Sequence, residues 1–202
     1  MDANNIQFTK LEMQIVKYLF KHYKERFNAR QLAKTLDINH AHANKLCGHL
    51  EKKNLLKKEA IGNAVYFSFK YEEKLAIKFM EYLLSLEEKE FPKWLSVVLH
   101  ELKKFKECII LGLIFGSSIK NDKFNDIDVV LVYEKNKIKE VNRIKEGIRN
   151  AHLIEQPIRY VDMTEKDMLL NKDNKVCYRM ISDNLIFYNA QEYVKVIRKC
   201  RK

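Results

Sequence analysis

Residues 111–118 read LGLIFGSS, and residues 125–132 read NDIDVVLV. Each segment holds an apolar run of the length of a buried strand, and a Gly-Ser turn follows the first run. Because side chains alternate along a strand, Asp126 and Asp128 are expected on one face, opposite the apolar side chains between them. Two carboxylates about 6–7 Å apart can bind a hard divalent cation, and a small-residue turn lets backbone N–H groups approach an anion. The two segments together predict a site for metal-assisted phosphoryl or nucleotidyl transfer.

This pattern resembles the DNA polymerase β-like nucleotidyltransferase superfamily, and in particular its minimal nucleotidyltransferases. In that family an apolar strand ends in Gly-Ser and the next strand carries Asp-x-Asp, as Gly116-Ser117 and Asp126-Ile127-Asp128 do here. The resemblance covers roughly residues 106–190, where turn, spacing and flanking strands agree together.

The resemblance implies a role for each part of the motif. The catalytic and metal-binding pair is Asp126 and Asp128, and the nucleotide-binding turn is Gly116, Ser117 and Ser118. Two Mg²⁺ ions would bridge the phosphates of an NTP, with ATP expected, while its NMP moves to a hydroxyl acceptor. That acceptor is a protein, a nucleic acid or a small molecule, and the family's role in toxin–antitoxin pairs makes a partner toxin one candidate.

The segment that should supply a third carboxylate, residues 157–165, departs from the family pattern. The expected carboxylate position falls on Arg159, whose guanidinium would neutralise the two aspartates and compete with metal. Asp162 faces the opposite way on the strand, so it or Glu155 could serve only if the alignment shifts. Two hypotheses therefore stay open: an active nucleotidyltransferase, and a degenerate one that senses a nucleotide or binds a partner.

The first 70 residues predict three short helices followed by a β-hairpin. Thr9 and Glu12 have the spacing of a capping box before an apolar helical stripe. Asn28 and Asn39 are candidate N-caps of the second and third helices, and residues 55–69 have the pattern of a hairpin. This arrangement resembles a winged helix-turn-helix, similar to prokaryotic transcription regulators. In that fold the third helix enters the major groove and the hairpin contacts the DNA backbone.

Polar and basic side chains on the third helix and the hairpin can pair with phosphates or base edges. The candidate DNA-binding residues are Asn39, His40, His42, Asn44, Lys45, His49, Lys57 and Lys58. Residues 1–70 contain 13 Lys and Arg against 6 Asp and Glu, whereas residues 71–202 contain 25 against 21. The basic excess lies mainly in the first part, which predicts double-stranded DNA as a partner. A winged helix used for dimerisation or protein docking is the alternative.

Composition limits the class of protein. With 47% hydrophobic and 32% charged residues among 202, the chain has the usage of an ordinary globular protein. The longest apolar run is too short to span a bilayer, and residues 1–8 lack the pattern of a signal peptide. We therefore expect a cytoplasmic protein with no membrane association. Four scattered cysteines without a Cys-x-x-Cys pair predict reduced thiols.

The expected fold class is α/β, in three parts. They are a winged helix-turn-helix (1–70), a helical connector (71–106) and a nucleotidyltransferase-like mixed sheet with flanking helices (107–202). The connector helices could form a homodimer or pack on the following domain. The leading functional hypothesis is a nucleotidyltransferase with a DNA-binding winged helix, dependent on Mg²⁺ and NTP. The alternative is a DNA-binding transcriptional regulator whose second half has lost its chemistry.

Overall fold

The computed structural model describes residues 7–120 and 123–201. The chain divides after Leu83 into two compact units, and Arg201 groups with the first of them. Each unit has its own sheet.

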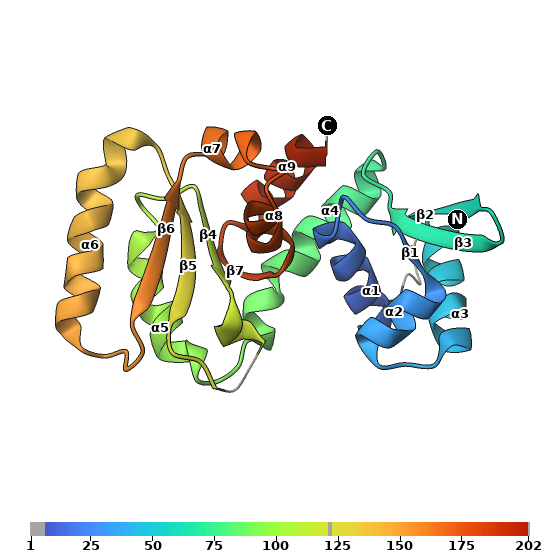
Figure 1. Cartoon of the computed structure of the whole chain (residues 1–202), viewed down its shortest axis with the longest axis horizontal. Helices are drawn as coiled ribbons and strands as arrows, with labels where there is room; N and C mark the ends of the chain where they lie inside the picture. Colours follow the sequence, from blue (N-terminus) through green and yellow to red (C-terminus); the bar gives the residue numbers. More distant parts are fainter. Residues whose placement is uncertain (1–6, 121–122, 202) are drawn as a thin grey trace. The chain divides into compact units, whose positions relative to one another are not determined.

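The first unit combines helices with a three-stranded antiparallel sheet. In chain order its elements are α1 (Lys10–Lys21), β1 (Phe27–Asn28), α2 (Ala29–Leu36), α3 (His40–Lys52), β2 (Leu56–Ile61), β3 (Ala64–Phe69) and α4 (Lys74–Ser85). The strand order is β1-β3-β2, and Figure 1 shows the β2–β3 hairpin beside the three helices. Three helices and a hairpin in this order form a winged helix-turn-helix, as predicted.

Side-chain caps fix the starts of the three helices. The Thr9 hydroxyl accepts the Glu12 backbone N–H at 3.2 Å, and the Glu12 carboxylate accepts the Thr9 backbone N–H at 2.8 Å. Asn28 and Gln31 repeat this capping box at the start of α2, with both distances 2.9 Å. Asn39 is the N-cap of α3. All three predicted caps are therefore present, which is why the helix starts could be placed from local sequence.

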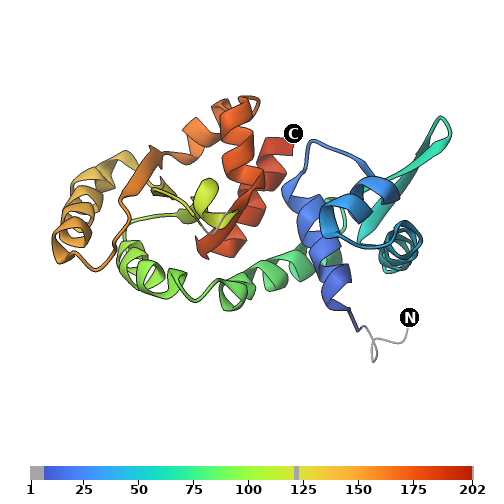
Figure 2. The ribbon, with the colours of Figure 1, turned by 60° about the horizontal axis from the view of Figure 1, so that its bottom comes forward.

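The second unit is a mixed sheet with helices on both sides. Its elements are η2 (Glu87–Glu90), α5 (Leu95–Leu102), η3 (Lys103–Phe105), β4 (Leu111–Phe115), η4 (Ser117–Ile119), β5 (Ile127–Val132), η5 (Lys135–Lys137), α6 (Ile138–Ala151), β6 (Ile158–Met163), α7 (Glu165–Leu170), α8 (Lys175–Ser182), β7 (Asn184–Tyr188) and α9 (Ala190–Arg201). The strand order is β6-β5-β4-β7, with β5 and β6 parallel and the other pairs antiparallel. Figure 2 shows α5 on one side of this sheet and α7, α8 and α9 on the other. The predicted mixed α/β architecture is confirmed at this level.

Both faces of the central strands are buried. Ile127, Val129 and Leu131 join a core with residues of α5 and α6, and Val130 on the opposite face is also fully buried. A strand that is covered on both sides carries a continuous apolar run rather than an alternating one. This explains why only the first residues of the β5 segment are charged.

The segment expected to be a separate connector, residues 71–106, is divided between the two units. Most of α4 lies in the first unit, whereas α5 belongs to the second. The apolar stripe of α5, from Leu95 through Val98 to Leu102, is buried in the core of the mixed sheet. The position of an amphipathic helix is set by the surface against which its apolar face packs. For α5 that surface is the mixed sheet of the second unit.

Among residues 7–120 and 123–201, no helix combines the length and apolar character that a membrane span requires. All four cysteines are buried, and none of them forms a disulfide. Burial raises the pKa of the Cys47 thiol to about 12, which makes it an unreactive packing residue.

Candidate functional site

Helix α3 presents one apolar and one polar face. Ala43, Leu46, Cys47 and Leu50 are buried on the inner side. The predicted DNA-binding residues of the cap and the helix are exposed on the other side: Asn39, His40, His42, Asn44, Lys45 and His49. The structure therefore places this set on the solvent-exposed side of α3.

His49 lies at a different part of this face from the others. Its Nδ1 is 3.9 Å from a carboxylate oxygen of Glu12, and Lys53 Nζ is 3.3 Å from the same oxygen. Burial works to raise the pKa of Glu12, but the hydrogen bond from the Thr9 backbone and the charge of Lys53 outweigh it, so that the pKa lies below its usual value. Glu12 is thus a charged anchor between α1 and the end of α3. The His49 ring therefore lies beside Glu12, away from the first turn of α3.

A polar hollow of about 400 Å³ lies beside the first turns of α3. It brings His40 and Asn44 of α3 together with Arg30 of α2 and Asn63 of the hairpin turn. Arg30 is exposed, and it supplies a guanidinium next to a helix that contains none. Sequence reasoning missed Arg30 because α2 was read only for its apolar stripe. Its position two residues after the Asn28 cap was the available signal.

The two predicted hairpin lysines lie on opposite faces of β2. Lys57 pairs in register with Ser68, and Lys58 pairs with the buried Phe67. Both lysines are exposed because the strand is at the edge of the sheet. Lys57 Nζ also lies 4.0 Å from Glu59. One DNA backbone on one face of the hairpin can therefore contact only one of the two lysines directly.

In the second unit, the predicted catalytic residues come together at the ends of β4 and β5. Phe115 pairs in register with Asp128, and the next residue, Gly116, has φ +85°. A Cβ added at Gly116 would lie 2.2 Å from Oδ2 of Asp128, so only glycine permits this approach. Ser117 is exposed, whereas Ser118 is buried and donates its hydroxyl to the Phe115 carbonyl at 3.4 Å. One serine of the turn is therefore free to meet solvent, and the other is used internally.

Arg159 occupies the position where a third carboxylate was sought. It pairs in register with Asp128 on the parallel strand β6, and its guanidinium forms an ion pair with Asp126 at 3.0 Å. Burial, and after it the charge of Asp126, raises the pKa of Asp128, while Arg159 opposes that shift. The alternative residue Asp162 is bound to Lys145 at 2.5 Å instead. Within residues 7–120 and 123–201, no three His, Cys, Asp or Glu side chains are grouped so that they could hold a metal ion.

The order of helices and strands in the first unit is that of a winged helix-turn-helix. No family model matches the chain, and no curated protein matches it. Among solved structures, the chain is similar to the adhesin competence repressor AdcR of Streptococcus pyogenes, with 15% identity over 76% of this chain and 86% of that one and a TM-score of 0.38. It is also similar to a mutant of ZitR from Lactococcus lactis, with 19% identity over 53% of this chain and 68% of that one and a TM-score of 0.36.

These findings correct the identification made from the motif. No family model supports a nucleotidyltransferase, and the similar solved structures are the adhesin competence repressor AdcR and ZitR. The assignment of residues 107–202 to that superfamily is therefore wrong, and transferase and toxin–antitoxin roles fall with it. The physical reason lies at Arg159, which takes the place of the third carboxylate and pairs with Asp126. The Mg²⁺ and NTP expected at Asp126, Asp128 and the 116–118 turn depended on that assignment.

Proposed function

We propose that this protein is a DNA-binding transcriptional regulator, in which the winged helix-turn-helix binds duplex DNA. The observation that carries the proposal is the exposed side of α3, which carries the hydrogen-bonding side chains of Asn39, His40 and Asn44 and the positive charge of Lys45. Asparagine can pair bidentately with adenine in the major groove, whereas lysine binds phosphate or guanine. The position of this face on the third helix of the fold is the one from which such proteins read DNA.

The residues around α3 extend this interface. Arg30 and Asn63 line the hollow beside His40 and Asn44, and Lys58 is exposed on the hairpin. Each cation that neutralises a phosphate releases condensed counterions, so affinity falls as salt rises, with a slope of about −0.9 for each contact. Arg30, Lys45 and Lys58 are the cations that we assign to this role.

Titrations of a labelled random-sequence duplex of about 30 base pairs, followed by fluorescence anisotropy at several salt concentrations, test the proposal. Lys45→Ala should weaken binding to all sequences and reduce the salt slope by about 0.9. Lys74→Ala removes an exposed lysine from α4 and serves as the matched control, with no change in slope. Absence of duplex binding even at low salt, or equal losses in the two variants, would contradict the assignment.

Base readout needs a separate measurement. Selection from a random duplex library should enrich a preferred sequence, and Asn44→Ala should cost about 1–3 kcal/mol of discrimination at one base pair. The salt slope of Asn44→Ala should stay that of the unaltered protein, because no phosphate contact is lost. An Asn44→Ala protein with unchanged preference would remove Asn44 from the reading set.

We also propose that the regulator forms a homodimer. Leu75 and Tyr82 of α4 are 57% and 60% exposed, and their spacing of seven residues puts them on one helical face. Dimers of such folds bind two half-sites about one helical turn apart. Sedimentation velocity of the full chain tests this: Leu75→Ser together with Tyr82→Ser should shift the species from dimer to monomer, and a monomer before substitution would contradict it.

A further inference from the structure

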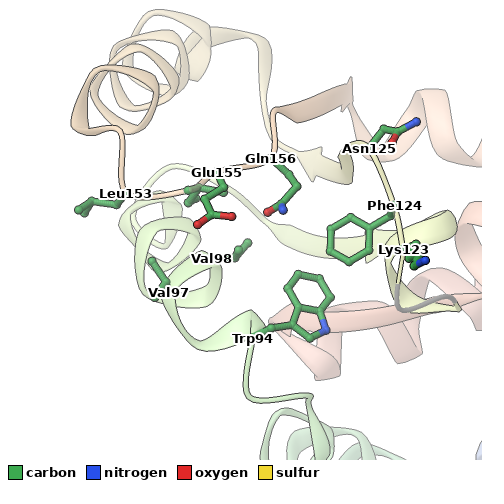
Figure 3. Close-up of a pocket in the computed structure, with 10 residues that line it drawn as sticks. Trp94, Val97, Val98, Lys123, Phe124, Asn125, Leu153, Glu155 and Gln156 are labelled. Carbon is green, nitrogen blue, oxygen red and sulfur yellow. The ribbon is translucent and has the colours of Figure 1, made fainter.

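The second unit contains a hollow of about 670 Å³ that no part of the proposed function uses. It lies between α5, residues 123–125 and residues 153–156, all within the second unit. Figure 3 shows these side chains around one open space. Its volume is within the range of about 300–1,000 Å³ that small-molecule sites occupy.

One wall of the hollow is apolar although it faces solvent. Nine large hydrophobic side chains are well exposed in the described part of the chain, and three of them line this hollow: Trp94, Val97 and Leu153, which are 38%, 48% and 58% exposed. The Trp94 and Phe124 rings are 4.7 Å apart, with 40° between their planes. Neighbouring rings of this kind give a firm apolar surface on which a ligand can stack. The concentration of exposed apolar surface in one concave place marks it as a binding site.

Of the two polar groups that extend into the hollow, the Glu155 carboxylate is negatively charged and the Gln156 amide is neutral. In Figure 3 the Glu155 carboxylate and the Gln156 amide extend into the open space, whereas the Asn125 amide points away from it. Lys123 lies beyond the Phe124 ring as seen from Glu155. Glu155 forms no ion pair with any other described residue, and its side chain is exposed. The carboxylate is therefore available to a ligand, and the electron-rich ring faces opposite it also attract positive charge.

We propose that this hollow binds a lipophilic organic cation, whose apolar body packs on Trp94 and Phe124 and whose positive centre faces Glu155. Gln156 provides a hydrogen-bonding group beside the carboxylate and orients a ligand that carries a polar substituent. The ring faces and the carboxylate act on the same charge from two sides, which selects a cation over an anion of the same shape. This site does not depend on DNA binding, so the two proposals are tested independently of each other.

Trp94 is the sole tryptophan, so its emission reports directly on this hollow in the intact chain. Tetraphenylphosphonium and tetraphenylborate have nearly the same size and shape and opposite charge, which isolates the effect of charge. We expect saturable quenching of Trp94 by the phosphonium. Glu155→Gln should weaken that binding about 2–5-fold, because one exposed ion pair is lost while the contact with the aromatic rings remains. Glu134→Gln removes an exposed acid outside the hollow and should leave the affinity unchanged.

A second variant adds charge instead of removing it. Val97 is half-exposed at the rim, so the Val97→Lys protein should fold normally. Its added positive charge should weaken binding of the phosphonium further. Quenching by the borate should not decrease in Glu155→Gln. The proposal is overturned if the phosphonium does not bind, if both ions bind equally and ignore Glu155, or if Val97→Lys converts a dimer of the chain into a monomer in sedimentation velocity.

Discussion

Replacing Gly116 by alanine tests how the turn after β4 is held. Gly116 has φ +85° and ψ −153°, a region that side chains other than glycine occupy only with strain. The added methyl would lie 2.2 Å from Oδ2 of Asp128. The backbone strain costs about 1–3 kcal/mol, and displacement of a packed carboxylate costs about 1–3 kcal/mol more. We expect Gly116→Ala to lower the free energy of unfolding of the second unit by about 2–6 kcal/mol.

Urea unfolding followed by Trp94 emission measures this change in the right unit, because Trp94 directly precedes α5. With an m value of about 2 kcal/mol per M, the midpoint should fall by about 1–3 M. Gly147→Ala is the matched control: it lies within α6 with nothing within 4 Å of an added Cβ, so it should raise stability by about 0.5–1 kcal/mol. Gly116→Ala combined with Asp128→Ser keeps the strain and removes the overlap, and should recover about half of the loss. Equal midpoints for Gly116→Ala and Gly147→Ala would refute the reasoning.

Three further changes have defined outcomes. Thr9→Ala removes the cap of α1 and releases its bond with Glu12, so thermal melting by circular dichroism should show a loss of about 0.5–2 kcal/mol; no loss would mean that the capping box is not stabilising. Gly48→Ala, in α3 with open space around the new methyl, should raise stability by about 0.5–1 kcal/mol in the same melt, and a decrease would show an unseen contact. Asp128 has a raised pKa, so the folded chain holds its proton more tightly than the unfolded chain, and ionisation costs stability as pH rises through that pKa. Asp128→Asn should therefore be more stable than the unaltered protein between about pH 4 and pH 7, and equally stable below about pH 3. Urea unfolding midpoints at each pH measure this difference, and a stability gain at low pH alone would contradict the argument.

The winged helix could be predicted from local sequence because its signals are local. The Thr9–Glu12 and Asn28–Gln31 boxes depend on residues three apart, and the hairpin turns at Gly62, where φ is +56°. Such features do not depend on which segments meet in space. The same applies to the β4 and β5 strands, whose apolar runs needed no partner to be recognised.

Features that depend on tertiary contacts could not be read in the same way. His49 is on the exposed side of α3, yet its neighbour is Glu12 of α1, 37 positions earlier in the chain. Arg30 reaches the polar hollow only because the starts of α2 and α3 and the hairpin turn meet there. The hollow around Trp94 is likewise formed by three separate segments. Periodicity assigns a side chain to a face, but the packing of elements decides what that face meets.

The motif that suggested metal chemistry has a structural use that needs no metal. Two carboxylates close together on one strand repel each other, and a nearby cation offsets that repulsion. Arg159 supplies that cation from β6 by its ion pair with Asp126, although its 71% exposure keeps the pair's contribution to about 1 kcal/mol or less. Gly116 permits Asp128 to lie against the turn backbone. Gly116, Asp126, Asp128 and Arg159 thus depend on one another for their packing. In this cluster the arginine supplies the positive charge that a bound cation would otherwise supply.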